Sequence, residues 1–140
     1  MKRATVYERR GELFFHSLSK TTAGVWILTS PYLKARSDDD EGIASNTLAV
    51  LDASVEGIAH PTKWTGLFDP ILKMAGVKSW NTFAKSARCI EAEEHGETIS
   101  VVPTRNLGVD EGFEPIASGR RVATRDTIAE AVRIAIQESS

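Results

Sequence analysis

The feature that most constrains the fold is a pattern of glycines and apolar residues that occurs twice, 85 positions apart. The matched positions are Gly11 and Gly96, Ile43 and Ile128, Ala44 and Ala129, and Leu51 and Ile136. The register slips by about two positions before the third expected strand and then recovers. We interpret the pattern as an internal repeat over about residues 3–57 and 87–140, with residues 61–86 inserted between the copies. A chance coincidence of such sparse matches is the alternative.

The first copy is predicted to be three strands and a helix. Residues 4–9, 13–19 and 25–29 alternate β-branched or aromatic residues with polar ones, which favours strands. Gly11 and Gly24 supply the turns, and Pro31 is expected to end the third strand because it lacks a ladder donor. A Ser37–Asp40 capping box precedes the helix. Its apolar face is expected to be Ile43, Thr47, Val50 and Leu51.

The second copy repeats this order, and the segment between the copies is predicted to be helical. Strands are expected over residues 87–93 and 97–102, with Pro103 closing the second, followed by an interrupted pairing within 113–122. The last helix carries Ile128, Val132, Ala135 and Ile136 on one face. In the insert, apolar residues recur at helical spacing from Trp64, Gly76 is a C-cap candidate and Ser79 an N-cap candidate.

The predicted fold class is therefore α+β: two β-β-β-α units with a mainly antiparallel sheet, joined by a helical insert. With 140 residues, the chain is expected to form one domain. Trp26 and Phe14 are expected to lie in the core, and Trp64 is expected to be packed.

Composition limits the possible functions. The net charge is −2, from 19 acidic and 17 basic residues, and no basic cluster indicates a nucleic-acid binder. Cys89 is the single cysteine, so an intramolecular disulfide is impossible, and its apolar neighbours predict a small buried residue. Neither a signal peptide nor a membrane helix is predicted. The expected location is the cytoplasm.

No catalytic, cofactor or metal-binding motif is present. His16, His60 and His95 lack the spacing of metal ligands, and we expect no metal and no cofactor. An enzymatic alternative pairs His16 with Lys20, or His60 with Lys63, in general acid–base cleavage of RNA. Only the residue types favour that alternative.

Acidic residues gather in three places along the chain: residues 38–41, the group Glu91, Glu93, Glu94 and Glu97, and the group Asp110, Glu111 and Glu114. Two stretches among them are our candidate contacts for a partner. The first is Asp38, Asp39, Asp40 and Glu41, and the second is Asp110 and Glu111. Such stretches are often only solvated helix starts or turns, but a negative surface also attracts a basic partner and speeds association. Lys20 and Arg105, in expected turns, are candidate polar contacts beside them.

Several short motifs, in order along nearly the whole chain, resemble one known family. They are Ser19-Lys-Thr-Thr-Ala-Gly-Val-Trp-Ile27, Trp64-Thr-Gly-Leu67, Met74-Ala-Gly-Val-Lys-Ser-Trp80, Pro103-Thr-Arg-Asn-Leu-Gly108 and Gly112-Phe-Glu-Pro-Ile116. They are similar to those of CdiI-type immunity proteins of bacterial contact-dependent growth inhibition systems.

The resemblance implies a small, non-enzymatic cytoplasmic protein that binds the C-terminal toxin domain of a CdiA protein. Toxins of these systems are commonly nucleases that act on tRNA or other RNA, and the immunity protein blocks the active site or the substrate-binding surface. A 1:1 complex is expected, without direct contact to nucleic acid or membrane. A small RNA-processing enzyme or a ligand-binding α+β domain are the alternatives.

Overall fold

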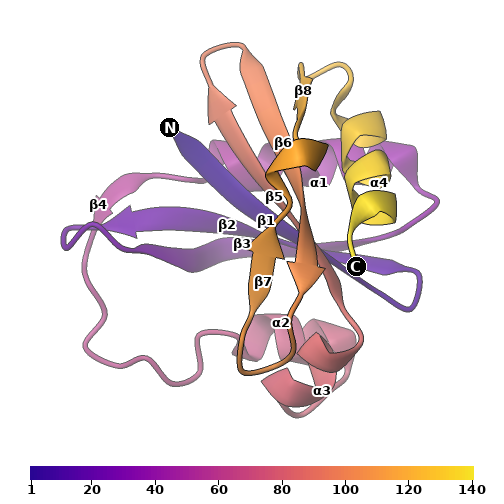
Figure 1. The fold of residues 1–140 in the computed structure, drawn as a ribbon. Helices are drawn as coiled ribbons and strands as arrows, with labels where there is room; N and C mark the ends of the chain where they lie inside the picture. Colours follow the sequence, from indigo (N-terminus) through magenta and orange to yellow (C-terminus); the bar gives the residue numbers. More distant parts are fainter.

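The computed structural model describes residues 1–140 and contains one eight-stranded sheet with helices on both faces (Figure 1). The elements are β1 (Lys2–Arg9), β2 (Glu12–Thr21), β3 (Trp26–Arg36), α1 (Asp40–Asp52), β4 (Glu56–Ile58), α2 (Asp69–Ala75), α3 (Trp80–Lys85), β5 (Arg88–His95), β6 (Thr98–Asn106), β7 (Phe113–Pro115), the 3-10 helix η1 (Ala117–Gly119), β8 (Arg121–Ala123) and α4 (Ile128–Glu138). The sheet order is β3-β2-β1-β5-β6-β7, and β4 and β8 pair with β2 and β6.

The two predicted β-β-β-α units lie on either side of the central pair β1 and β5. These two strands are antiparallel neighbours, β2 and β3 continue the sheet beyond β1, and β6 continues it beyond β5. The third strand of the second unit is split, because β8 pairs with Ile99–Val101 and β7 with Thr104–Asn106. The predicted α+β fold with a mainly antiparallel sheet is confirmed. Descent of the two units from one duplicated segment stays a prediction.

Helices α1 and α4 lie side by side on one face of the sheet and cover the larger core (Figure 1). The predicted apolar faces are confirmed, since the α1 residues Ile43 and Leu51 and their counterparts Ile128 and Ile136 are buried in this core. The predicted capping box is wrong. The N-cap of α1 is Asp39, whose carboxylate accepts a hydrogen bond from the Gly42 amide at 3.0 Å.

The two prolines expected to end strands lie inside them. In β3 the pairing moves from His16↔Tyr32 to Ser17↔Thr29, so Pro31 lies in a bulge where no ladder donor is needed. In β6 the carbonyl of Pro103 accepts from the Ile116 amide, so its nitrogen faces the sheet edge where β7 and β8 are interrupted. Both strands therefore continue beyond the proline.

Helices α2 and α3 cover part of the opposite face and form a second core. Phe83 of α3 is fully buried and lies edge-on against Tyr7 and Phe14 of the sheet. Cys89 is buried in this core, as predicted. Gly76 ends α2 with a φ of 72°, and the Ser79 hydroxyl caps α3, as predicted.

The insert is less helical than its periodicity indicates. Residues 59–68 form a connection without helix, and α2 begins only at Asp69. Trp64 lies in this connection and is 51% exposed, so the expectation that it is packed is wrong. Trp26 is only half-buried, while Phe14 is in the core.

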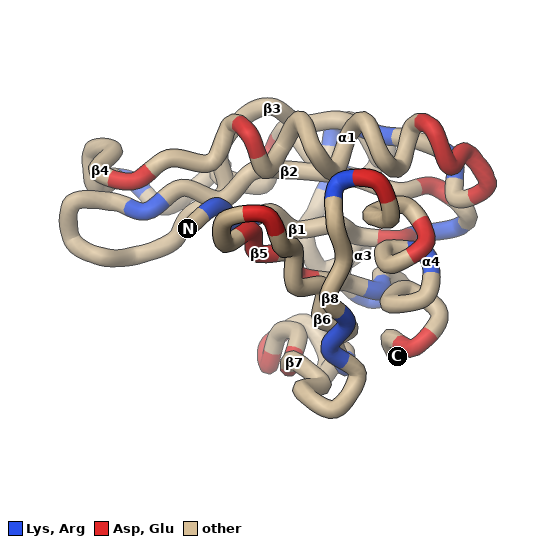
Figure 2. Tube along the Cα trace, turned by 90° about the horizontal axis from the view of Figure 1, so that it is seen from above, with Lys and Arg blue, Asp and Glu red and all other residues tan.

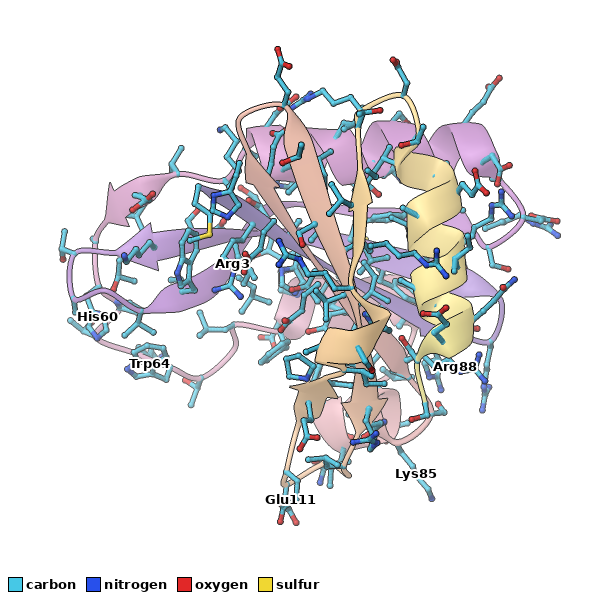
Figure 3. All side chains as sticks on the ribbon, turned by 45° about the horizontal axis from the view of Figure 1, so that its top comes forward. Arg3, His60, Trp64, Lys85, Arg88 and Glu111 are labelled. Carbon is cyan, nitrogen blue, oxygen red and sulfur yellow. The ribbon has the colours of Figure 1, made fainter.

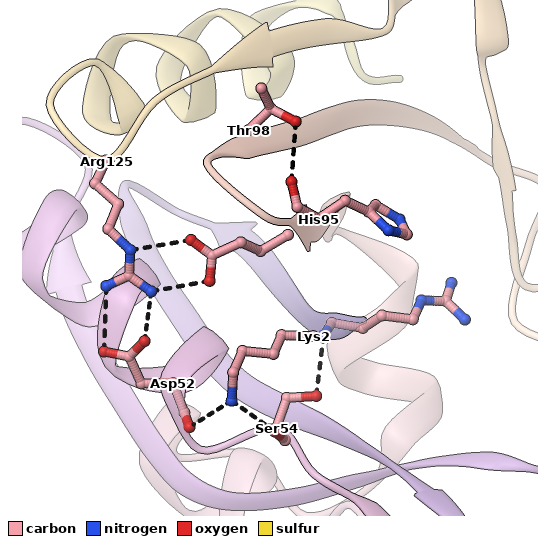
Figure 4. A network of polar contacts seen from close by, with 8 residues as sticks. Lys2, Asp52, Ser54, His95, Thr98 and Arg125 are labelled. Carbon is pink, nitrogen blue, oxygen red and sulfur yellow. Dashed lines mark hydrogen bonds and ion pairs between the residues drawn. The ribbon is translucent and has the colours of Figure 1, made fainter.

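A network of charged side chains joins the two units at the end of α1 (Figure 4). Arg125, just before α4, donates to both carboxylate oxygens of Glu94 on β5 at 2.9 Å and also to Asp52 of α1. The Lys2 ammonium donates to the carbonyls of Asp52 and Ser54 at 3.1 Å. Because Arg125 of the second unit binds both Glu94 of that unit and Asp52 of the first unit, the network links the two units. No helix of the structure is long and apolar enough to cross a membrane.

Candidate protein-binding surface

The insert leaves uncovered a part of the sheet face that lies opposite α1 and α4. Two cavities of about 410 and 390 Å³ open on this part, and Glu91 of β5 lines both. We call the combined hollow the sheet groove. Its floor is formed by side chains from β1, β2, β5 and β6 that share one face because strand residues alternate between faces.

The first cavity forms the apolar half of the sheet groove. Thr5, His16 and Leu18 line its floor. The 59–68 connection supplies one wall through Trp64, and Trp26 of β3 lines the cavity as well. Figure 3 shows Trp64 beside His60 on this connection, on the side of the molecule opposite Arg88. A concave surface with aromatic walls is typical of sites where a partner buries a few anchoring side chains.

The second cavity forms the polar half and runs toward β7 and η1. It is lined by Arg3, Glu93, Ser100, Val102, Pro115, Ala117 and Arg120, in addition to Glu91. Arg120 donates to the Ser100 hydroxyl and makes no ion pair. The Arg3 guanidinium pairs with Glu93 at 3.1 Å and lies over the ring of Trp26, 5.2 Å from its centroid.

Glu91 is the one carboxylate in the middle of the sheet groove that has no ion-pair or hydrogen-bond partner. Burial raises its pKa above the usual range, the Arg3 charge opposes this shift, and the Glu93 charge adds to it. The Arg3 guanidinium pairs with Glu93, so Glu91 keeps its lone pairs available. A half-buried, unpaired carboxylate is costly to maintain, and a cation brought by a ligand relieves that cost.

The histidines do not form the acid–base pairs of the enzymatic alternative. His16 is 2% exposed, its Nδ1 lies 2.8 Å from the Ser17 carbonyl, and burial lowers its pKa to about 4. His60 Nδ1 lies 3.0 Å from the Thr21 hydroxyl, and its ring packs edge-on against Trp64. His16 is therefore packed in the floor of the sheet groove, and His60 packs against Trp64 of its wall. No cluster of histidine, cysteine and carboxylate side chains is arranged to hold a metal ion.

The acidic residues predicted as contacts around the start of α1 are present as one exposed stretch (Figure 2). Two of them have structural roles: Asp39 caps α1, and Asp40 pairs with Arg133 of α4 at 2.8 Å. Asp38 pairs with the exposed Arg36 at 3.2 Å. The pair of Asp38 is exposed to solvent and Glu41 makes no ion pair, so these two carboxylates are the ones that a partner can reach.

The other predicted contacts lie elsewhere. Asp110 and Glu111 are exposed in the turn between β6 and β7, where Figure 3 shows Glu111 at the tip. Arg105 on β6 pairs with Glu114 on β7 at 3.0 Å across the same hairpin. Lys20 is the next-to-last residue of β2 and pairs in register with Trp26, on the face of the sheet groove. The structure therefore does not bring the eight predicted residues into one patch.

Comparison with known structures identifies proteins of the same fold. A protein of unknown function from Neisseria meningitidis has a TM-score of 0.81 and 14% identity, over 99% of this chain and 95% of that chain. A chain described as a CdiA-CT/CdiI toxin and immunity complex from Yersinia pseudotuberculosis has a TM-score of 0.79 and 12% identity, over 99% and 97%. No protein-family model and no curated protein sequence matches the chain. At these identities the likeness shows the fold.

Proposed function

We propose that this chain is an immunity protein that binds and neutralises the C-terminal toxin domain of a CdiA-type protein. The observation that carries the proposal is the structural likeness, over nearly the full length of both chains, to a chain of a CdiA-CT/CdiI toxin and immunity complex. The sequence motifs that resemble CdiI-type proteins support the same function independently. In this function the chain is not an enzyme and acts in the cytoplasm of the cell that makes it.

We further propose that the toxin is a nuclease and that the complex is 1:1. A nuclease binds phosphates and therefore presents a basic cleft. The exposed acidic stretch at the start of α1 complements such a cleft, and its binding there occludes the active site or the surface that holds RNA. Binding at nanomolar concentration or tighter, roughly −12 kcal/mol, is what neutralisation of a lethal enzyme requires.

The test is co-expression with the C-terminal domain of the polypeptide encoded immediately upstream. Expression of that domain alone is expected to stop growth, and expression of this chain with it is expected to restore growth. Purified toxin domain is expected to degrade tRNA or total RNA, and one molar equivalent of this chain to stop the degradation. Growth arrest that persists with full expression of this chain contradicts the proposed function for that partner.

The acidic stretch is tested with charge reversals that spare the α1 cap. Asp38→Lys and Glu41→Lys change exposed charges, whereas reversal of Asp39 or Asp40 also removes the N-cap or the pair with Arg133. The association rate with the toxin domain is expected to fall several-fold and the salt dependence to weaken, because both depend on charge complementarity. Glu97→Lys, in the exposed turn between β5 and β6, is the control. Unchanged kinetics for both variants excludes this stretch from the interface.

A further inference from the structure

We propose that the sheet groove is the docking site for a basic segment of the partner protein, whose arginine or lysine pairs with Glu91. The inference rests on the proposed function, because it names the surface and the partner chemistry of that same interaction. It differs from the contacts predicted at residues 38–41 and 110–111, which are exposed outside the groove.

The shape of the groove fits an extended segment of a protein better than a small molecule. Its two halves, of about 410 and 390 Å³, meet at Glu91 in the middle of the sheet. A small ligand fills one of the two cavities, whereas a loop or strand of a protein spans both. The first half offers aromatic and aliphatic walls, and the second offers polar groups, which matches the apolar centre and polar rim of protein interfaces.

The charges of the groove favour a positively charged group of the partner at its centre. Arg3 is already paired with Glu93, so the two charges offset each other. Glu91 faces the groove without a partner, and desolvation of its carboxylate is relieved by an incoming cation. Arg120, at the η1 end of the groove, makes no ion pair and remains available for an acidic or carbonyl group of the same segment.

The groove also contains an internal example of how it binds such a cation. The guanidinium of Arg3 lies 5.2 Å from the centroid of the Trp26 ring, within the range of a cation–π contact. Trp64, which is 51% exposed and lines the same half of the groove as Trp26, offers a second indole face. A partner arginine at Glu91 therefore meets a carboxylate with indole rings nearby, the residue types that most often dominate binding energy.

A substitution at Val102 can place a positive charge of the chain itself beside Glu91. Val102 and Glu91 are Cα partners on adjacent antiparallel strands, so their side chains are neighbours on the groove face. In Val102→Arg, the new guanidinium is expected to pair with Glu91 and to exclude the partner's cation. Val102→Gln has a similar length without the charge and is the matched control. Thermal denaturation checks that each variant is folded.

The experiment measures binding of each variant to the C-terminal domain encoded immediately upstream, by isothermal titration calorimetry. Glu91→Gln, Trp64→Ala and Val102→Arg are each expected to weaken binding at least tenfold. Val102→Gln and the distant control Glu97→Gln are expected to bind within about threefold of the wild type, well below the tenfold step that corresponds to about 1.4 kcal/mol.

The outcomes separate this inference from the proposed function. If the wild type binds and Glu91→Gln, Trp64→Ala and Val102→Arg bind equally well, the groove proposal is overturned while the proposed function stands. If the wild type does not bind, both are overturned for this partner. If free agmatine saturates the groove at micromolar concentration and shifts tryptophan fluorescence, with no effect of the variants on the toxin domain, the site belongs to a small cation and the protein-docking proposal is wrong.

Discussion

Replacement of Arg125 tests whether the network at the end of α1 holds the two units together. Arg125 makes two charge-assisted hydrogen bonds to Glu94 at 2.9 Å and two further ones to Asp52. The Glu94 side chain is 8% exposed, whereas those of Arg125 and Asp52 are 43% and 57% exposed. Arg125→Met removes the charge and keeps most of the side-chain length. The main consequence is a buried carboxylate on β5 without its partner.

The expected loss of stability follows from these exposures. Removal of one member of a fully buried ion pair costs about 3–5 kcal/mol. Water reaches Glu94 once the partly exposed Arg125 side chain is removed. We therefore expect the Glu94 contact to contribute a smaller loss, about 2–3 kcal/mol of the free energy of unfolding. The exposed Asp52 contact adds at most about 0.5 kcal/mol. For a chain of this size, the melting temperature is expected to fall by roughly 5–10 °C.

Urea unfolding followed by tryptophan fluorescence at pH 7 measures the effect, with Arg121→Met as a matched control. Arg121 pairs with Glu138 at 2.8 Å, but both side chains are about 40% exposed, so its loss is expected to cost below about 0.5 kcal/mol. The double variant Arg125→Met/Glu94→Gln is expected to recover part of the loss, because no buried charge remains. Equal stabilities of the Arg125→Met and Arg121→Met variants would refute the reasoning.

The pH dependence provides a check on the same contact. The hydrogen bond from Arg125 lowers the pKa of Asp52, and this effect outweighs the opposing effect of partial burial. The folded state therefore holds the Asp52 proton less tightly than the unfolded state. The stabilisation is present above the unfolded pKa of about 4 and is lost as pH falls through the lower folded value. The difference between Arg125→Met and wild type is expected to narrow below about pH 4.

Three further predictions concern the buried side chains Phe83, His16 and Cys89. Phe83→Ala is expected to cost about 3–5 kcal/mol in urea unfolding, because this ring is fully buried against Tyr7 and Phe14; a loss below about 1 kcal/mol would show that α3 is not held by it. His16 stays neutral in the fold down to about pH 4, while it takes up a proton near pH 6.5 when unfolded, so stability is expected to fall by about 2 kcal/mol from pH 7 to pH 5. The stability of His16→Gln is expected not to fall in this way over the same pH range. If it falls as in the wild type, the pH dependence arises from other groups. Cys89 is buried and burial raises its pKa, so a thiol reagent is expected to label it only in denaturant; rapid labelling of the native protein would contradict its burial.

Features with a local period were predictable from the sequence. Ile43 and Leu51, eight residues apart, lie on one helical face whatever surrounds the helix, and Gly76 ends α2 through its own backbone conformation. The α+β order followed from such local patterns. The exact N-cap did not, because Ser37 and Asp39 both have capping side chains, and only the entry of the chain from β3 decides between them.

The prolines and the sheet groove depend on contacts that no local pattern reveals. Pro31 is tolerated in β3 because the ladder to β2 shifts at that point, and Pro103 because its nitrogen faces an interrupted edge. The groove brings together Trp26, Trp64 and Glu91 from three distant segments. The signal in the sequence was the placement of Trp26 and Trp64 beside turn residues.

The asymmetry of the sheet explains why a single groove is present in a chain built from two similar units. On one face, α1 and α4 occupy corresponding positions in the two units, and together they cover both halves of the sheet with one core. The opposite face has no α-helix from either unit, and only the short 3-10 helix η1 lies at one end of the groove. Its cover is the insert that occurs once, and α2 and α3 pack only over the part around Tyr7 and Phe14. The rest of that face is left as the groove, so the segment outside the repeated pattern determines which part of the sheet stays uncovered.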